Sequence, residues 1–179
     1  SNCFIQPKLD GMRCIAFIED GNVRLMSRDG KTIENMDHIT LALSPISNCI
    51  LDGELYIHGS TFQENMKLIK KYVTGETESV QYHVYDMIAT DLDFESRKLI
   101  VDDFASGIKE LSLVSTYPVS DQKNVDHYHI LFLSEGYEGS IVRHGTKGYE
   151  VDKRSQSLLK LKDFIDIDAE IIDVLPNEA

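Results

Sequence analysis

Four Asp-Gly pairs punctuate the first 53 residues of this 179-residue chain. The pair Asp20-Gly21 stands between an apolar run, CIAFI at 14–18, and an alternating run, NVRLM at 22–26. Asp-Gly between two such runs is typical of a tight β-hairpin, because both residues tolerate the backbone angles that the turn requires. The opening part of the chain is therefore expected to contain antiparallel strands.

Strand-like segments continue to the end of the sequence. Alternation or a high content of β-forming residues predicts strands at 49–57, 80–88, 113–119, 139–143, 157–164 and 168–175. The first of these is expected to be interrupted or bulged near Gly53.

Three segments have helical spacing instead. Helices are expected at 60–72 with Ser60 as the cap, at about 95–111, and at 126–136 closed by Gly136. In the first of these helices Phe62, Met66 and Ile69 have helical spacing. In the second, the candidate inward positions are Leu99, Phe104 and Ile108. Because strands outnumber helices and hairpin turns join many of them, the expected fold is α+β, with largely antiparallel β-sheets flanked by helices.

Charge and cysteine content narrow the functional classes. Eighteen basic and thirty acidic residues give a formal net charge of −12, whereas a surface that binds nucleic acid throughout is usually basic. Any nucleic-acid site therefore needs positive charge gathered in one face or cleft, or carried by another domain. No apolar run is long enough to cross a bilayer and no signal pattern opens the chain, so no membrane contact and a cytoplasmic location are expected. The three cysteines suit free thiols in a reducing compartment.

Four short pieces concentrate chemically useful residues: KLDGMR at 8–13, LDGELY at 51–56, EGSIVR at 138–143 and LLKLK at 158–162. A lysine that attacks a nucleoside triphosphate must first lose its proton, and its ordinary pKa is about 10.4. Partial burial and neighbouring cations both lower that pKa, and cations also neutralise the triphosphate. The candidate cations are Arg13, Lys160 and Lys162, of which the two lysines share one face if they lie on a strand.

In this order, and with the weaker pieces SRDGK at 27–31 and YHVYDMI at 82–88, the pieces resemble the signature of the covalent nucleotidyltransferases. These are the ATP-dependent DNA ligases, the RNA ligases and the mRNA capping enzymes. The resemblance runs from about Gln6 to Lys162. It implies that Lys8 attacks the α-phosphate of ATP, forms a lysyl-AMP phosphoramidate and releases pyrophosphate.

The same resemblance implies roles for the other motif residues. Arg13 and Arg28 match contacts to ribose and phosphate, and Arg28 also matches a contact to the 5′-phosphate of a nick. Glu54 matches the residue that binds the ribose hydroxyls. For the base it implies stacking by Tyr85 and recognition of the adenine edge by Gln6. Phosphate contacts are implied for Lys160, Lys162 and Arg154, and a contact to Mg²⁺ (or Mn²⁺) for Glu138.

Within this superfamily the sequence is most similar to small bacterial and viral DNA ligases. EGSIVR resembles the ligase form of its motif, and the run from 149 to 175 is similar to the tail of such an adenylation domain. The resemblance implies an adenylation domain at 1–164, then a linker and the first strand of a C-terminal oligonucleotide-binding (OB) fold at 165–179. It further implies nicked double-stranded DNA as partner, a monomer, and the cytoplasm of a bacterium or of a phage-infected cell.

Two other interpretations stay open. One is an RNA ligase or capping-type enzyme, possibly using GTP, and the other is a catalytically silent module that binds nucleotide. Each motif residue taken alone is also compatible with a plain structural role: Lys8 with a solvated turn, Tyr85 with core packing, Lys160 and Lys162 with the wet face of a strand. His127 and His129 are expected to be structural or solvated, because residues two apart on a helix do not share a face.

Overall fold

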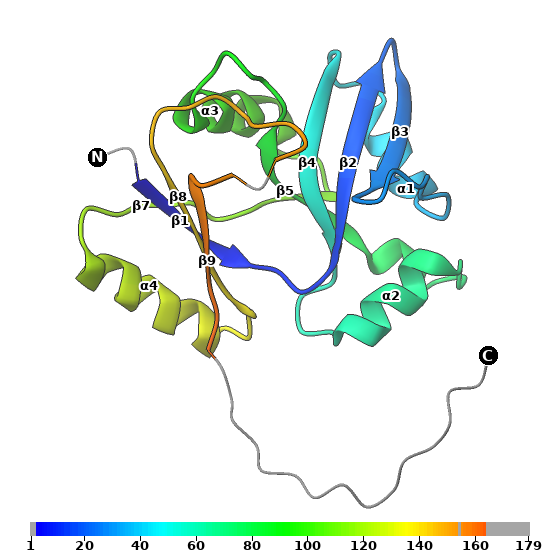
Figure 1. Ribbon diagram of the computed structural model, residues 1–179. Helices are drawn as coiled ribbons and strands as arrows, with labels where there is room; N and C mark the ends of the chain where they lie inside the picture. Colours follow the sequence, from blue (N-terminus) through cyan, green and yellow to red (C-terminus); the bar gives the residue numbers. More distant parts are fainter. Residues whose placement is uncertain (1–2, 154, 164–179) are drawn as a thin grey trace, which may run out of the picture.

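The computed structural model describes residues 3–153 and 155–163. Within them the chain forms two sheets that are flanked by helices (Figure 1). The nine strands are β1 (Cys3–Lys8), β2 (Met12–Glu19), β3 (Asn22–Ser27), β4 (Cys49–Tyr56), β5 (Gln81–Met87), β6 (Leu111–Leu113), β7 (Tyr117–Pro118), β8 (Gly139–His144) and β9 (Leu158–Leu161). The predicted strand at 168–175 lies outside the described residues.

The larger sheet has the order β3-β2-β4-β5-β6. Its first two strands form the predicted hairpin, in which Asp20 and Gly21 both have positive φ. The predicted irregularity in β4 is also confirmed, because the register with β5 shifts between Asp52 and Gly53. A Cβ atom on Gly53 would lie 2.5 Å from the carbonyl oxygen of His83, so only glycine fits at this position without displacing the neighbouring strand.

The smaller sheet has the order β7-β1-β8-β9, with antiparallel pairing throughout. The single strand predicted at 113–119 is wrong, because this segment supplies the end of β6 to one sheet and β7 to the other. β6 pairs with β5 in parallel, whereas every other pair among the described strands is antiparallel. The α+β prediction with largely antiparallel sheets is therefore confirmed.

Four α-helices cover the sheets: α1 (Asp37–Leu43), α2 (Phe62–Lys70), α3 (Phe94–Ala105) and α4 (Gln122–Ser134). A 3₁₀ turn, η1 (Thr77–Ser79), precedes β5. α1, α2 and α3 pack on the larger sheet, and α4 packs on β8 and β1 of the smaller sheet (Figure 1). None of the described helices is long and apolar enough to cross a membrane.

Two details of the helix predictions are wrong. The cap of α2 is Thr61 and not Ser60, because the Thr61 hydroxyl accepts from the backbone of Glu64 while the Glu64 carboxylate accepts from the backbone of Thr61. α3 ends at Ala105 rather than near 111, and its Leu99 is 67% exposed instead of inward. Phe104 and Ile108 do pack against the core of the larger sheet.

Candidate active site

A cleft of about 980 Å³ lies between the two sheets. β1, β8 and β9 line it from the smaller sheet, β2, β4 and β5 line it from the larger one, and residues of the 145–158 segment close one end. Eight cationic and five acidic side chains border it, although the whole chain carries twelve more acidic than basic residues. The cleft thus has a local excess of cationic side chains, which is what the sequence interpretation asks of any nucleic-acid site.

Lys8 is the last residue of β1 and borders the cleft. Its Cα pairs with that of Gly139, and its carbonyl accepts from the backbone N–H of Glu138 at 3.1 Å. A Cβ atom on Gly139 would lie 2.2 Å from the carbonyl oxygen of Leu161, so the glycine lets β9 run close beside this strand end. The close approach brings three motifs together at one point.

Glu138 joins two lysines at this point. One carboxylate oxygen forms an ion pair with Lys8 Nζ and the other forms an ion pair with Lys162 Nζ. The Lys8 side chain is 17% exposed and that of Glu138 is 21% exposed, so solvent screens this arrangement only in part. Three residues from three separate motifs thus form one charged cluster beside the cleft.

The pKa of Lys8 is lowered, mainly because burial disfavours the ammonium, while the carboxylates of Glu54 and Asp10 oppose that shift. The direction agrees with the expectation from the sequence, but crowding by cations is not its main cause. Arg13 in particular is turned toward Asp52, whose carboxylate it binds through Nε and Nη2 at 3.0 Å each. The charged groups that act on Lys8 most strongly are acids.

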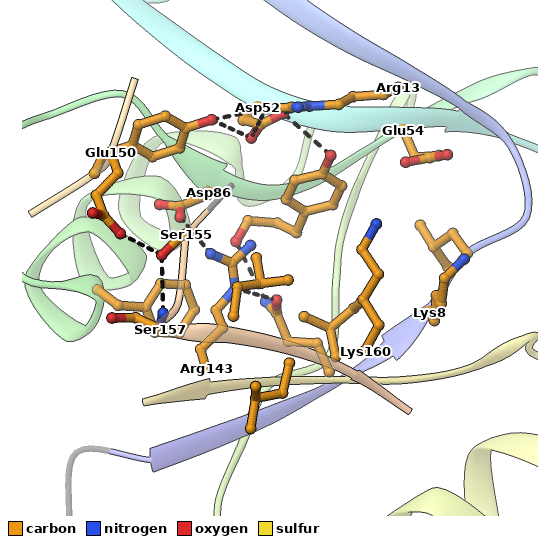
Figure 2. Close-up of a pocket in the computed structure, with 18 of the residues that line it drawn as sticks. Lys8, Arg13, Asp52, Glu54, Asp86, Arg143, Glu150, Ser155, Ser157 and Lys160 are labelled. Carbon is orange, nitrogen blue, oxygen red and sulfur yellow. Dashed lines mark hydrogen bonds and ion pairs between the residues drawn. The ribbon is translucent and has the colours of Figure 1, made fainter. Parts of the chain in front are cut away.

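Glu54 lies on β4 and borders the cleft, and in Figure 2 its carboxylate and the amine of Lys160 point into the same space. Burial raises the pKa of Glu54 to about 7 and Asp52 adds to the increase, whereas Lys8, the backbone N–H of Gly11 and Arg13 oppose it. This carboxyl group therefore titrates near neutral pH.

Asp52 is the hub of a second polar group (Figure 2). Besides Arg13, its carboxylate accepts from the hydroxyls of Tyr85 at 3.1 Å and Tyr149 at 2.6 Å. Tyr149 also accepts from Arg13 Nη2 at 2.9 Å. Its backbone N–H donates to the carbonyl of Ala89 at 3.1 Å, so the segment after β8 is held against the larger sheet.

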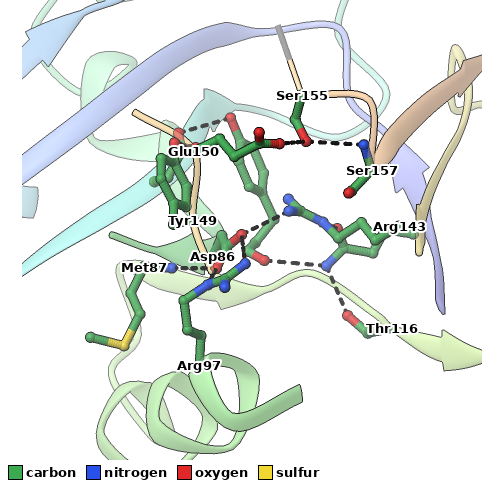
Figure 3. A network of polar contacts seen from close by, with 12 residues as sticks. Asp86, Met87, Arg97, Thr116, Arg143, Tyr149, Glu150, Ser155 and Ser157 are labelled. Atoms are coloured by element: carbon green, nitrogen blue, oxygen red, sulfur yellow. Dashed lines mark hydrogen bonds and ion pairs between the residues drawn. The ribbon is translucent and has the colours of Figure 1, made fainter. Parts of the chain in front are cut away.

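A buried ionic network lies under the Tyr85 end of the cleft (Figure 3). Asp86 binds Arg97 through both carboxylate oxygens, at 2.7 and 3.0 Å, and its second oxygen also accepts from Arg143 Nη1 at 2.7 Å. Arg143 Nε donates to Gln6 Oε1 at 2.8 Å. The guanidinium of Arg143 lies 4.6 Å from the ring centre of Phe94, which fixes it further.

The remaining residues predicted from the sequence differ in position. Gln6, Tyr85 and Lys160 border the cleft. Arg28 borders it too, but its side chain is 78% exposed and lies 3.8 Å from the carboxylate of Asp29. Lys162 follows the end of β9 and faces Glu138, and Arg154 lies outside the described residues.

Oxygen donors for a divalent metal are present beside Lys8. Mg²⁺ in phosphate-binding sites usually takes one or two carboxylates and completes its coordination with substrate oxygens and water. Glu138 and Glu54 supply carboxylates of that kind, although no group of three His, Cys, Asp or Glu residues in the described chain forms a protein-only metal site. The donor set therefore fits a metal that arrives with phosphate.

Several residues of the site had no assigned role in the sequence interpretation: Asp52, Asp86, Arg97, Thr116, Arg143 and Tyr149. Asp52, Asp86 and Arg143 belong to the motifs themselves. The need of each motif cation for a nearby carboxylate is the signal that could have identified them. Tyr149 and Thr116 reach the site only through tertiary contacts. His129, by contrast, bonds Ser140 Oγ at 2.9 Å and Asp163 at 3.2 Å, away from the cleft.

The sequence of residues 1–162 matches the family described as the ATP dependent DNA ligase domain. The DNA ligase of African swine fever virus (strain Badajoz 1971 Vero-adapted) is 29% identical, over 94% of this chain and 43% of the viral protein. The DNA ligase of enterobacteria phage T4 is 23% identical, over 97% of this chain and 47% of the phage protein. This chain therefore spans less than half the length of these relatives.

Solved structures share the fold. The Chlorella virus DNA ligase-adenylate superimposes with a TM-score of 0.72 at 20% identity, over 90% of this chain and 61% of that one. A Lig E DNA ligase gives a TM-score of 0.75 at 22% identity, over 90% of this chain and 62% of that one.

Proposed function

Because this chain belongs to the ATP-dependent DNA ligase domain family, we propose that its cleft binds ATP and that Lys8 becomes covalently joined to AMP. The observation that carries the proposal is the position of the Lys8 amine, half-buried beside a cleft large enough for a nucleotide, with a lowered pKa. A solvated surface lysine would have none of these properties.

The chemical step is a transfer of the nucleotidyl group to nitrogen. The Lys8 ammonium first gives up its proton, which its lowered pKa makes less costly. The amine then forms a bond to the α-phosphorus as the bond from that phosphorus to the bridging oxygen breaks. Pyrophosphate leaves, and the nitrogen gives up a second proton to solvent to become the phosphoramidate. In-line placement of the amine and neutralisation of the phosphates supply most of the catalysis in such reactions.

The residues around Lys8 suit this step. Lys160 borders the cleft and Lys162 is held beside Lys8 through Glu138, so both are near enough to contact phosphate after small side-chain movements. Arg13 and Arg28 are proposed to contact ribose and phosphate, and Arg154 a phosphate. Glu54 is proposed to accept from the ribose hydroxyls, Tyr85 to stack on the base and Gln6 to contact its edge.

Mg²⁺ (or Mn²⁺) would be held by Glu138 together with phosphate oxygens, and it would supply neutralisation of the triphosphate charge. Glu138 also holds the amines of Lys8 and Lys162 beside the cleft.

The later steps are proposed from the family. AMP passes to the 5′-phosphate of nicked double-stranded DNA, and the 3′-hydroxyl then displaces AMP to seal the nick. An OB-fold domain that begins at about 165–179 is the proposed intramolecular partner, with residues 1–164 as the adenylation domain. A monomer in the cytoplasm of a bacterium or of a phage-infected cell is the proposed setting.

The test is covalent labelling. The chain is incubated with Mg²⁺ and α-labelled ATP or GTP, denatured, and examined for acid-labile label on the peptide that contains residue 8. We expect label from ATP that is lost in both Lys8→Ala and Lys8→Arg and retained in Lys109→Ala, which removes an exposed lysine outside the cleft. Label from GTP would favour a capping-type enzyme, and binding without label would favour a silent nucleotide-binding module. Sealing of nicked DNA against nicked RNA by the longer protein then distinguishes the two kinds of ligase.

A further inference from the structure

The side-chain amide of Gln6 is held in one orientation by groups that cannot exchange hydrogen-bonding roles (Figure 3). Arg143 Nε–H can only donate, so the atom that faces it at 2.8 Å must be the amide oxygen. The carbonyl of Tyr85 can only accept, so the atom that faces it at 3.3 Å must be the amide nitrogen. A flip of the amide would leave both partners mismatched in a buried place.

Thr116 uses the second hydrogen of the same nitrogen. Gln6 Nε2 lies 2.9 Å from Thr116 Oγ1, whose own proton is directed at the carbonyl of Val114 at 3.0 Å. The threonine hydroxyl therefore accepts from Gln6, and both amide hydrogens of Gln6 are committed to the protein. The oxygen keeps one lone pair, because Arg143 Nε occupies only one of its two.

The arginine is itself firmly placed. Its Nη1 binds Asp86, which is also bound by Nε and Nη2 of Arg97, and the Asp86 side chain is fully buried. Thr116, unlike Gln6 and Arg143, does not border the cleft. Any effect of Thr116 on a bound nucleotide must therefore pass through Gln6.

From this arrangement we infer that Thr116 and Arg143 are positioning residues for base selectivity: they leave Gln6 able to accept, but not to donate, a hydrogen bond at the base end of the cleft. The inference rests on the proposed function, because it assumes that the base lies beside Gln6. An exocyclic amine, as on the six-position of adenine, matches the free lone pair. A carbonyl oxygen at that position, as in guanine and hypoxanthine, would face the Gln6 oxygen with no hydrogen between the two acceptors, which disfavours binding.

The test compares ATP with inosine triphosphate, whose base carries a carbonyl oxygen at the six-position in place of the amine and a hydrogen on the neighbouring N1. The kcat/KM of lysyl-nucleotide formation is measured for both nucleotides in the wild-type chain, Thr116→Val, Thr116→Ser and Arg143→Lys. Thr40→Val, at a half-buried position of α1 outside the cleft, is the matched control for loss of a threonine hydroxyl.

We expect the wild-type chain to prefer ATP by about tenfold or more, the effect of one well-made hydrogen bond. Thr116→Val frees one amide hydrogen and is expected to reduce that preference several-fold, mainly through KM, by improving the use of inosine triphosphate. Thr116→Ser, which keeps the hydroxyl, and Thr40→Val are expected to retain the wild-type ratio. Arg143→Lys removes the donor that holds the amide oxygen and is expected to reduce the ratio as well.

An unchanged nucleotide ratio in Thr116→Val and Arg143→Lys, with labelling by ATP intact, overturns the inference. If the wild-type chain forms no covalent label at all, the proposed reaction is wrong. The inference is then tested by the dissociation constants of the two nucleotides, measured by competition with a fluorescent ATP analogue, and by the ratio between them. A general loss of stability lowers the use of both nucleotides together, so it cannot imitate a change in their ratio.

Discussion

Lys8 and Lys162 are held side by side by one carboxylate, that of Glu138, which uses a different oxygen for each. Lys8 ends β1, Glu138 directly precedes β8, and Lys162 directly follows β9. The antiparallel register of β1 with β8 and of β8 with β9 brings them to the same edge of the smaller sheet. The first and last motifs of the sequence, more than 150 residues apart, thus meet at the proposed nucleophile.

Replacement of Asp10 by asparagine is expected to move the acid limb of the pH–rate profile for lysyl-AMP formation to lower pH. The Asp10 carboxylate raises the pKa of Lys8, so its removal leaves a larger fraction of the amine unprotonated at a given pH. Because Asp10 is exposed and outside the cleft, the shift should be modest. The measurement is the rate of lysyl-AMP formation against pH, with Asp103→Asn as the control. A limb that moves to higher pH would contradict the expectation.

Glu54→Gln is expected to change how stability depends on pH. The pKa of Glu54 is raised from 4.5 to about 7 in the folded chain, so this group's stabilising contribution is complete below pH 4.5 and is lost as pH rises through 7. Glutamine does not titrate. Between pH 4.5 and 7.5, the free energy of unfolding of the wild-type chain should therefore fall by about 2 kcal/mol relative to that of the variant, after allowance for partial solvation. Denaturant titrations of both chains at both pH values measure these free energies of unfolding. An equal change in the wild-type chain and in Glu54→Gln would contradict the expectation.

Asp86→Asn is expected to destabilise the fold by about 3–5 kcal/mol, because it leaves the buried guanidinium groups of Arg97 and Arg143 without their counter-ion. Asp102→Asn is the matched control, since it removes a carboxylate from the more exposed pair with Lys98 on α3 and should cost less than about 1 kcal/mol. Urea unfolding followed by circular dichroism compares the two. Equal losses would mean that the buried network contributes no more than a surface pair.

Gly53→Ala should cost at least about 3 kcal/mol, because the new methyl group would lie 2.5 Å from the His83 carbonyl and 2.6 Å from the Tyr82 ring, where it overpacks the sheet. Gly30→Ala is a suitable comparison. No atom lies within 4 Å of its added methyl, and only the positive φ of 74° disfavours alanine, by about 1 kcal/mol. Thermal and urea unfolding of both variants give the difference, and a Gly53→Ala chain as stable as Gly30→Ala would show that β4 and β5 can separate at the bulge.

The hairpins and most strands were predictable from the sequence because alternation and Asp-Gly turns act over short distances. The division of 113–119 between two sheets was not, because Val114 bonds to β5 while Tyr117 pairs with β1, and such choices depend on distant partners. The prediction that Leu99 of α3 faces inward was wrong for a related reason. Arg97 points inward to meet Asp86, and hydrophobic spacing cannot reveal a buried charge.

The site was predictable to the extent that its residues belong to motifs. Gln6, Lys8, Arg13, Arg28, Glu54, Tyr85 and Lys160 all border one cleft, and Glu138 and Lys162 meet Lys8 beside it. The pairing of Arg13 with Asp52 was not predictable, because it depends on the local geometry of the β4 bulge and on a tyrosine from another segment. Motif spacing shows which residues gather, but not which of them neutralise one another.

The segment that follows β8 does more than bound the cleft. Its Gly148 lies so near Thr90 that an added Cβ atom would stand 1.8 Å from the Thr90 carbonyl oxygen, and the next residue is fastened to both Ala89 and Asp52. This end of the cleft is therefore held in place by close backbone packing and by hydrogen bonds. Arg28 also borders the cleft, and its side chain is 78% exposed, so the lining of the cleft combines a fixed segment with a solvated arginine.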